Sequence, residues 1–268
     1  MWAASLTVFF AIIEIVYGFI SGSLMIIGDG VHMSSDAISL TLSLIATIVA
    51  SKVATSNRTF GFKRFEPIAA FINGLTLVII PLYIIYEAFS RMVNPVEIME
   101  KQMLVVGIIG LLINALVGYI LSKGNHNINM RSAMLHVFAD MITSLSAVIV
   151  ALAILFFDFI WLDPIGSIVT SFIIIRGGIA ITKEAFNILM EGTPNGYSVD
   201  AIRKTIKSIT PILTVEDVKI WCVNEDEVYT MIRVHAPIET TRGIHVMIKE
   251  KVSLATNIPL EHIYVDVN

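Results

Sequence analysis

Long apolar runs separated by short polar breaks dominate the first part of the chain. A membrane-spanning helix needs about 20 mostly apolar residues, within a range of about 17–25. On this basis we predict six spanning helices, at residues 6–20, 24–49, 68–89, 103–121, 133–157 and 165–181. Turn-forming residues stand at the breaks between them, among them Ser-Gly-Ser at 21–23, Asn-Pro at 94–95, Lys-Gly-Asn at 123–125 and Asp-Pro at 163–164.

The pattern changes after residue 182. Residues 199–208 and 244–256 show helical periodicity, and Ser198 stands where the first of these helices needs a cap. Residues 213–223, 227–236 and 262–267 have the character of strands. The order α-β-β-α-β predicts a small α+β sandwich with helices on one face of the sheet. We therefore predict a six-helix transmembrane domain at 1–182 and a small polar domain at 183–268.

The composition agrees with a membrane protein and excludes other classes. The chain is 56% hydrophobic and only 15% charged, with a mean hydropathy of +0.80, whereas an ordinary soluble domain carries about 25% charged residues. A net charge of −4 gives no excess of positive charge with which to bind nucleic acid. The single Cys222 excludes an intramolecular disulfide and a thiol-rich metal site. The first apolar run lacks a basic leader, so we expect no cleavable signal peptide.

Basic residues in the short loops set the expected orientation, because Lys and Arg concentrate in cytosolic loops. If the N-terminus is inside, the cytosolic loops hold Lys52, Arg58, Lys63, Arg64, Lys123 and Arg131, and the outer loops hold only Arg91 and Lys101. We therefore predict that both termini, and with them the polar C-terminal domain, are cytosolic.

Two histidine–aspartate pairs stand inside the predicted spans. His32 and Asp36 are four residues apart, as are His136 and Asp140, and residues at that spacing share one face of a helix. An aspartate in the hydrocarbon region costs about 2.5–3.5 kcal/mol on insertion scales, so intramembrane carboxylates are usually functional. The second and fifth predicted spans are antiparallel. If their helices start near Leu24 and Ile128, the midpoint of each pair lies ten residues in, or about 15 Å at about 1.5 Å per residue. That is half of a hydrocarbon core of about 30 Å, so the four side chains can meet.

The two pairs together supply a ligand set for a metal. Two imidazole nitrogens and two carboxylate oxygens suffice for tetrahedral Zn²⁺, and a two-histidine site favours zinc over hard ions such as Mn²⁺ or Mg²⁺. Metal needs neutral imidazole and ionised carboxylate, so its binding displaces protons. We predict that His32, Asp36, His136 and Asp140 bind zinc. Two other interpretations are buried hydrogen-bonded pairs that only bridge helices, and a proton relay without metal.

Five motifs resemble the cation diffusion facilitator family, in its zinc-transporter branch, and together they extend over most of the chain. They are SLMIIGDGVHMSSD at 23–36, FGFKRFEPIAAFING at 60–74, LHVFAD at 135–140, DPIGS at 163–167 and LMEGTP at 189–194. The resemblance implies a homodimer that exports Zn²⁺, or Cd²⁺ or Co²⁺, from the cytosol. It also implies that residues 183–268 form a metallochaperone-like cytosolic domain for dimerisation or regulation. We expect a bacterial cell membrane as the location.

Further polar residues in the predicted spans have competing interpretations. Asp29 matches an aspartate of the family motif, and it either orients His32 by a hydrogen bond or caps the outer end of its helix. Glu14, in the middle of the first span, either guides metal or protons or lines a wet interface. Asn73 and Asn114 predict hydrogen bonds between helices.

Three loop features complete the sequence picture. Asp163 before Pro164 predicts a cap at the start of the last spanning helix. Many relatives carry a His-rich loop between the fourth and fifth spans, but here that loop holds His126 alone, which predicts a plain solvated loop. Some relatives bind metal through histidines between the second and third spans. Residues 51–65 contain no histidine, so we expect that site to be absent.

The predicted cytosolic domain has a weaker candidate site. Where relatives often have two histidines on the first strand, this chain has Glu216 and Lys219, and a protonated lysine cannot bind zinc. His235 and His262 match family histidines. A zinc site at the dimer interface could use these two with a carboxylate such as Glu216 or Asp266. The alternative is a dimerisation module that has lost or weakened its metal site.

These observations predict a secondary active zinc exporter, not an enzyme, that works by proton exchange through a two-His two-Asp site at mid-membrane. Its partners are then a second copy of the chain, the lipid bilayer, divalent metal ions and protons. The alternative from another class is a metal-responsive membrane sensor without flux, and the sequence has no appended output domain to favour it. An ion channel would instead show passive conductance without proton coupling.

Overall fold

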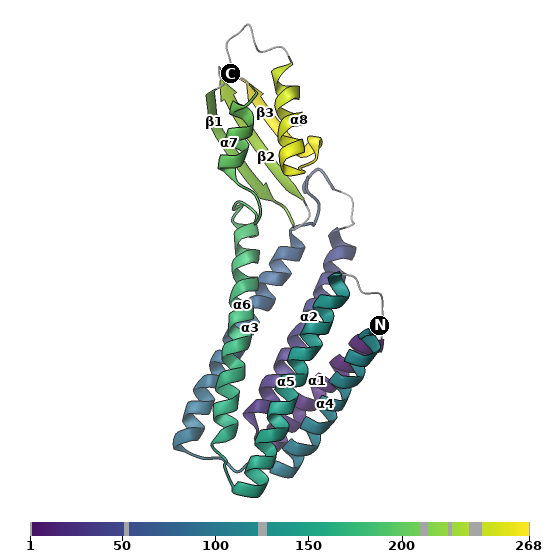
Figure 1. Cartoon of the computed structure of the whole chain (residues 1–268), viewed down its shortest axis with the longest axis vertical. Helices are drawn as coiled ribbons and strands as arrows, with labels where there is room; N and C mark the ends of the chain where they lie inside the picture. The colour runs from purple at the N-terminus through teal and green to yellow at the C-terminus, as the bar shows by residue number, and fades with distance from the viewer. Residues whose placement is uncertain are drawn as a thin grey trace. The chain divides into compact units, whose positions relative to one another are not determined.

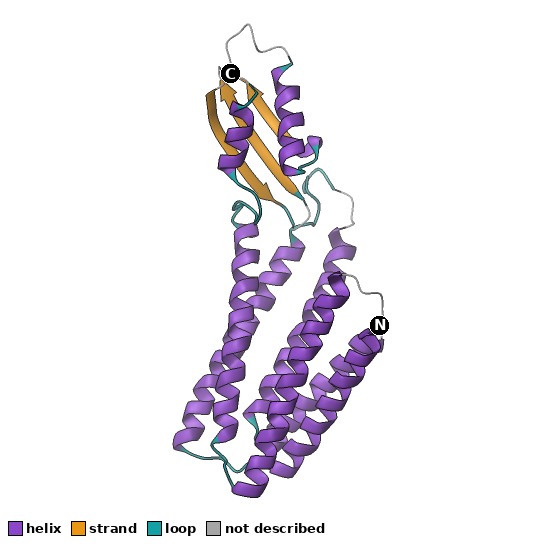
Figure 2. Ribbon diagram, in the orientation of Figure 1, coloured by secondary structure: helices purple, strands orange, loops and turns teal. Residues whose placement is uncertain are grey.

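The computed structural model describes residues 2–50, 54–122, 128–209, 214–224, 227–235 and 243–267. Some helical stretches are described by their backbone alone, and these include Asp36 and residues 128–136. The described chain forms six long helices followed by a small domain of helices and strands (Figure 1). Within the described residues, the strands lie in this last part of the chain (Figure 2). The predicted fold class, a helical membrane protein with an appended α+β domain, is confirmed.

Each predicted span lies inside one long helix. The helices are α1 (Trp2–Ser21), α2 (Leu24–Ala50), α3 (Phe65–Val93), α4 (Glu100–Ser122), α5 (Ile128–Phe157) and α6 (Leu162–Leu189). Among the described residues, four segments are long and apolar enough to cross a membrane, namely Phe65–Val93, Glu100–Ile120, Asp140–Phe157 and Leu162–Leu189. Val8–Ser21 is a shorter apolar helix. Large apolar side chains such as Phe89 and Phe172 stay exposed on the helices, because lipid is as apolar as they are.

The helix ends follow from local chemistry. α1 ends before Gly22, whose φ of 74° lies in the left-handed region that glycine adopts without steric cost. α5 ends before Asp158, which also has a positive φ, of 58°. Aspartate is one of the few residues with a side chain that tolerates this conformation. Both positions therefore reverse the chain between two long helices.

Contacts divide the chain into two compact units. The first consists of Met1–Thr41 with Ile72–Ile181, and the second of Leu42–Phe71 with Thr182–Asn268. The ends of α2, α3 and α6 thus belong to the same unit as the C-terminal domain. The functional division at residues 182 and 183 stays a prediction.

Apolar side chains of α1, α2, α4 and α5 form one core in the first unit. Its members include Phe10, Met33, Met103 and Ala147. Small residues bring the helices close together: a Cβ at Gly107 of α4 would lie only 3.1 Å from the Val148 side chain of α5. Such small residues are typical of helix contacts within membranes. The four predicted metal ligands belong to two of these helices, α2 and α5.

The C-terminal domain has the predicted element order. Its elements are α7 (Val199–Lys207), β1 (Thr214–Cys222), β2 (Val228–His235), α8 (Ile244–Thr256), the short 3₁₀ helix η2 (Leu260–His262) and β3 (Ile263–Val267). The sheet order is β1-β2-β3, with β1 antiparallel and β3 parallel to β2. The Ser198 hydroxyl accepts a hydrogen bond from the Ala201 N–H (3.4 Å), which confirms the predicted cap. Residues Ile206, Ile232, Ile248 and Ile263 form the centre of the core between the two helices and the sheet.

Candidate metal centre

His32 and Asp140 meet across the contact between α2 and α5. His32 Nε2 lies 3.6 Å from an Asp140 carboxylate oxygen, Oδ1. Asp140 is buried, with 7% of its surface exposed, and His32 is partly buried. Both residues belong to the first compact unit. One imidazole and one carboxylate from the two predicted pairs therefore stand side by side.

The other two predicted ligands lie on the same helices. Asp36 follows His32 by one turn of α2, and His136 precedes Asp140 by one turn of α5. Their side chains lie outside the described residues. Among the residues whose side chains are described, no three His, Cys, Asp or Glu groups cluster closely enough to hold a metal. The complete four-ligand site stays a prediction.

Asp29 binds to α5 through two hydroxyl groups. Its carboxylate accepts hydrogen bonds from Thr143 Oγ1 (2.9 Å) and from Ser144 Oγ (3.2 Å). The same Thr143 hydroxyl is 2.8 Å from the main-chain carbonyl of Asp140. Asp29 therefore fixes α2 against the turn of α5 that carries Asp140. The sequence offered no sign of these partners, since serine and threonine occur throughout the spans, and the role of Asp29 toward His32 stays a prediction.

Two asparagines make the predicted hydrogen bonds between helices. Asn73 of α3 accepts a hydrogen bond from the Ser35 hydroxyl of α2 (3.0 Å). Asn114 Nδ2 of α4 donates to the Ser144 hydroxyl of α5 (3.1 Å). Ser144 thereby connects Asn114 with Asp29, so one polar network extends through α2, α4 and α5 beside the candidate site. Both predictions are confirmed.

Asp163 stabilises a different helix from the one we predicted. It belongs to the first turn of α6, but its carboxylate accepts hydrogen bonds from the Leu24 N–H (2.9 Å) and the Met25 N–H (3.2 Å) at the start of α2. The Ser23 hydroxyl donates a third, at 2.5 Å. The predicted cap on its own helix is therefore replaced by a cap on the helix that carries His32. The four unpaired N–H groups of any helix start attract an acceptor, and tertiary packing supplies this one.

The candidate site of the C-terminal domain consists of residues with other neighbours. His262 stacks on Tyr229 (ring centroids 4.1 Å apart), and its Nδ1 lies 3.1 Å from the Val228 carbonyl oxygen. Asp266 accepts a hydrogen bond from Arg233 Nε (3.1 Å). His235, opposite Thr214 at the end of β2, and Glu216 are exposed. Within the described part of one chain, no three of these side chains gather around a point, so a zinc site there stays a prediction.

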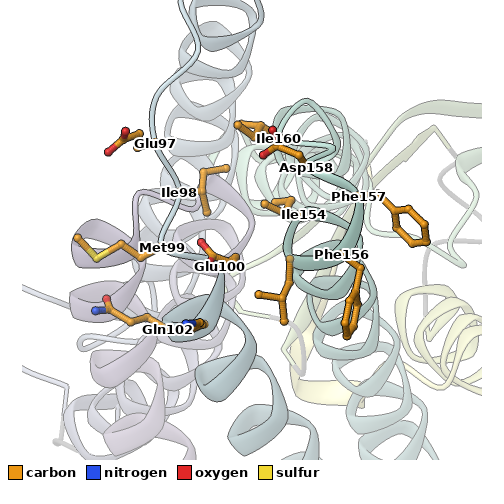
Figure 3. Close-up of a pocket in the computed structure, with 12 residues that line it drawn as sticks. Glu97, Ile98, Met99, Glu100, Gln102, Ile154, Phe156, Phe157, Asp158 and Ile160 are labelled. Carbon is orange, nitrogen blue, oxygen red and sulfur yellow. The ribbon is translucent and has the colours of Figure 1, made fainter.

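A pocket of about 940 Å³ lies elsewhere in the first unit (Figure 3). It is lined by the loop before α4, the first residues of α4 and the end of α5, including Glu97, Glu100 and Asp158. It contains none of the predicted metal ligands. The candidate metal centre rests instead on the contact between α2 and α5. The predicted solvated loop with His126 lies outside the described residues and stays a prediction.

Comparison with known proteins identifies similar chains. The family described as the cation efflux transmembrane domain matches residues 1–190. A cadmium, cobalt and zinc/H(+)-K(+) antiporter of Bacillus subtilis is 44% identical over 217 residues, which cover 80% of this chain and 70% of the relative. The zinc transporter ZitB of Escherichia coli is 34% identical over 86% of this chain and 75% of its own. The metal cation efflux system protein CzcD of Cupriavidus metallidurans is 30% identical over 97% of this chain and 83% of the relative.

Proposed function

This chain belongs to the cation efflux family, and on that basis we propose that it exports Zn²⁺ from the cytosol in exchange for protons. It is a membrane transporter of metal cations and not an enzyme. Cd²⁺ and Co²⁺ are further substrates in the proposal, because a relative at 44% identity carries all three metals in its name. The metal is cargo, and the chemistry needed is reversible binding and release.

The juxtaposition of His32 and Asp140 inside the helix contact carries this proposal. A histidine of α2 and a carboxylate of α5 lie 3.6 Å apart, and each has its predicted partner one turn away on the same helix. A zinc ion binds imidazole nitrogen at about 2.0–2.1 Å and carboxylate oxygen at about 2.0–2.2 Å, so two such groups can share one ion after a small adjustment. We propose Asp36 and His136 as the remaining two ligands.

Exchange for protons follows from the ligand types. A metal ion binds neutral imidazole and ionised carboxylate, so its binding displaces any proton that these groups carry. A site open to the cytosol would take Zn²⁺ and release protons there, and a site open to the other side would do the reverse. The positive-inside distribution of Lys and Arg supports an orientation with both termini in the cytosol.

The C-terminal domain has a supporting role in this proposal. We propose that it joins two copies of the chain into a homodimer, because a helix–sheet domain with exposed apolar side chains such as Val246 and Leu254 benefits from a covered surface. A zinc site shared by two such domains, with His235, His262 and a carboxylate, would then form only in the dimer.

Transport by purified protein in liposomes tests the proposed function. Zinc-sensitive and pH-sensitive dyes trapped inside report both ions for the unaltered chain and for His32→Ala and Asp140→Ala. We expect zinc uptake with opposite proton movement, reduced more than about 100-fold in both variants, since even groups that only support a metal ligand account for about 10–100-fold. Asp158→Asn, in a loop, is the control and should transport normally.

Two other outcomes would contradict this function, and a third would contradict the site. Zinc binding without flux under any gradient would favour the sensor. Flux that never opposes a zinc gradient would favour a channel. Unchanged transport in both variants would remove the site assignment.

A further inference from the structure

Glu14 is a buried carboxyl group that the metal site does not use. It lies in the middle of α1, and only 1% of its surface is exposed. Its Oε2 atom is buried and has no hydrogen-bond partner among the described residues. A buried charge without a donor or a counter-ion is among the most costly arrangements in a protein. Glu14 therefore needs a positively charged ligand, and the smallest is a proton.

Two glycines on neighbouring helices make room for this side chain. A Cβ at Gly30 of α2 would lie 2.9 Å from Glu14 Cβ, and one at Gly110 of α4 would lie 3.1 Å from Glu14 Oε1. Contacts under 3.0 Å essentially never occur for real Cβ atoms, and the position at Gly110 would also meet Phe10 at 2.9 Å. The space on both sides of Glu14 is thus available only because these residues lack side chains.

The charged groups around Glu14 are mostly negative. Asp29 of α2 and Asp140 of α5 both act on it electrostatically. His32, on α2, belongs to the same group of charges through Asp29. From α4 it approaches Gly110, which has no side chain, and Asn114 one turn further along α4 is uncharged and bound to Ser144. Like charges disfavour a third carboxylate here.

We propose that Glu14 is a proton-binding site, separate from the metal ligands, that carries one of the protons exchanged for each metal ion. The inference rests on the proposed function and deepens it. While the metal site is empty, Glu14 holds its proton as a neutral carboxylic acid. A divalent cation bound at His32 and Asp140 offsets the negative charge of Asp140 and Asp29, so the O–H bond of Glu14 can break and the proton leaves to water as the metal enters. Release of the metal leaves the negative charge of these carboxylates without compensation, and Glu14 takes up a proton again.

Proton counting in liposomes tests the site. Glu14→Gln mimics the protonated form and cannot release a proton, so we expect zinc transport to continue with one proton fewer per zinc ion than in the unaltered chain. Potassium is left out on both sides, so that protons alone are counted. Glu87→Gln is the matched control: Glu87 is also a carboxylate in a spanning helix, but it accepts a hydrogen bond from Arg91 Nε (3.0 Å), and its loss should leave the ratio unchanged.

Failure of the proposed zinc–proton exchange can be told apart from failure of the Glu14 assignment. If the unaltered chain moves zinc without protons, the proposed exchange itself is wrong. If it exchanges zinc for protons and Glu14→Gln shows the same ratio, only the assignment of Glu14 is overturned.

A second measurement keeps the inference testable if Glu14→Gln does not insert into the membrane. Infrared difference spectra of the unaltered protein, with and without zinc, should show a protonated carboxyl band that disappears on zinc binding. The band should shift when the glutamates are labelled with carbon-13. Its absence, or its insensitivity to that label, overturns the proposal.

Discussion

Asp163 accepts three hydrogen bonds at the start of α2, from the Ser23 hydroxyl and from the N–H groups of Leu24 and Met25. Nearby, an Arg91 Nη1 group donates to the Gly22 carbonyl oxygen. The first turn of α2 is therefore held by side chains of α3 and α6. Asp163 is fully buried, so water cannot replace it as an acceptor.

We expect Asp163→Ala to destabilise the protein. Each buried N–H group left without an acceptor costs about 1–3 kcal/mol, and the N–H groups of Leu24 and Met25 would both lose theirs. Thermal unfolding of the detergent-solubilised protein measures the effect as a lower Tm. Asp163→Asn keeps one carbonyl oxygen and should lose less. Equal Tm values for all three proteins would contradict the role of Asp163 as the cap of α2.

Glu14 and Asp29 show, also at the residue scale, how neighbouring side chains determine the role of a carboxyl group. Asp29 has two hydroxyl donors from α5, whereas Glu14 Oε2 has none among the described residues. Asp29 is therefore suited to remain a fixed acceptor between helices. Glu14 is suited to gain and lose a proton.

At the scale of elements, glycines determine how closely helices approach. A Cβ at Gly178 of α6 would lie 2.8 Å from Leu77 Cβ of α3 and 3.1 Å from the Gly74 carbonyl oxygen. The adjacent Gly177 has nothing within 4 Å of the same position. Two neighbouring glycines of one helix thus have opposite surroundings, and only the first is needed for packing.

This pair provides a matched test of helix packing. Gly178→Ala should lower Tm, because the added methyl group meets backbone atoms that can move only if α3 and α6 separate; overpacking typically costs about 1–3 kcal/mol. Gly177→Ala should be neutral or stabilising by up to about 1 kcal/mol, since alanine favours a helix more than glycine does. Thermal unfolding of both variants under one condition is the measurement. A larger loss for Gly177→Ala would refute the packing argument.

In the sheet of the C-terminal domain, the side chains around Tyr229 determine the protonation state of its phenol. Tyr229 of β2 lies between Trp221 of β1 and His262, with ring centroids 5.8 Å and 4.1 Å away. Burial, followed by the negative charge of Glu227, raises the pKa of the Tyr229 phenol. The phenol therefore stays neutral and keeps its hydroxyl within hydrogen-bond distance (3.4 Å) of Glu227 Oε2.

At the scale of the whole molecule, the segment between α2 and α3 contacts the C-terminal domain within the second compact unit. Lys63 pairs with Glu227, and Arg64 Nη2 lies 2.6 Å from Glu191 Oε1. Phe60 adds an edge-to-face contact with Tyr229, with ring centroids 5.6 Å apart. A segment that belongs to the cation efflux domain by sequence thus packs with the domain that follows it.

Exchanging the charges of Lys63 and Glu227 tests this contact. Lys63→Glu alone and Glu227→Lys alone should each lower Tm, because each places like charges together in a partly buried position. The double variant should recover most of the loss, with a coupling energy of about 0.5–3 kcal/mol, as expected for residues in contact. Additive effects of the two changes would show that the pair contributes nothing to this junction. Arg64 and Glu191 are more exposed and should show a smaller coupling.

Local sequence determined a large part of this protein. The six long helices, the order of the C-terminal elements and the presence of a histidine and an aspartate on one face of both α2 and α5 were all predicted. The reason is physical: insertion into lipid and helix or strand periodicity depend on sums over neighbouring residues. The two asparagines were also predicted, because a buried amide in a membrane needs a partner on another helix.

Only the tertiary structure decided which side chains meet. It placed His32 beside Asp140, gave Asp29 its hydroxyl partners on α5, put the Asp163 carboxylate on α2 instead of α6, and enclosed Glu14 between Gly30 and Gly110. These contacts depend on the rotation and register of each helix against its neighbours. Rotation and register are set by the close packing of many side chains together, and no short stretch of sequence contains that information.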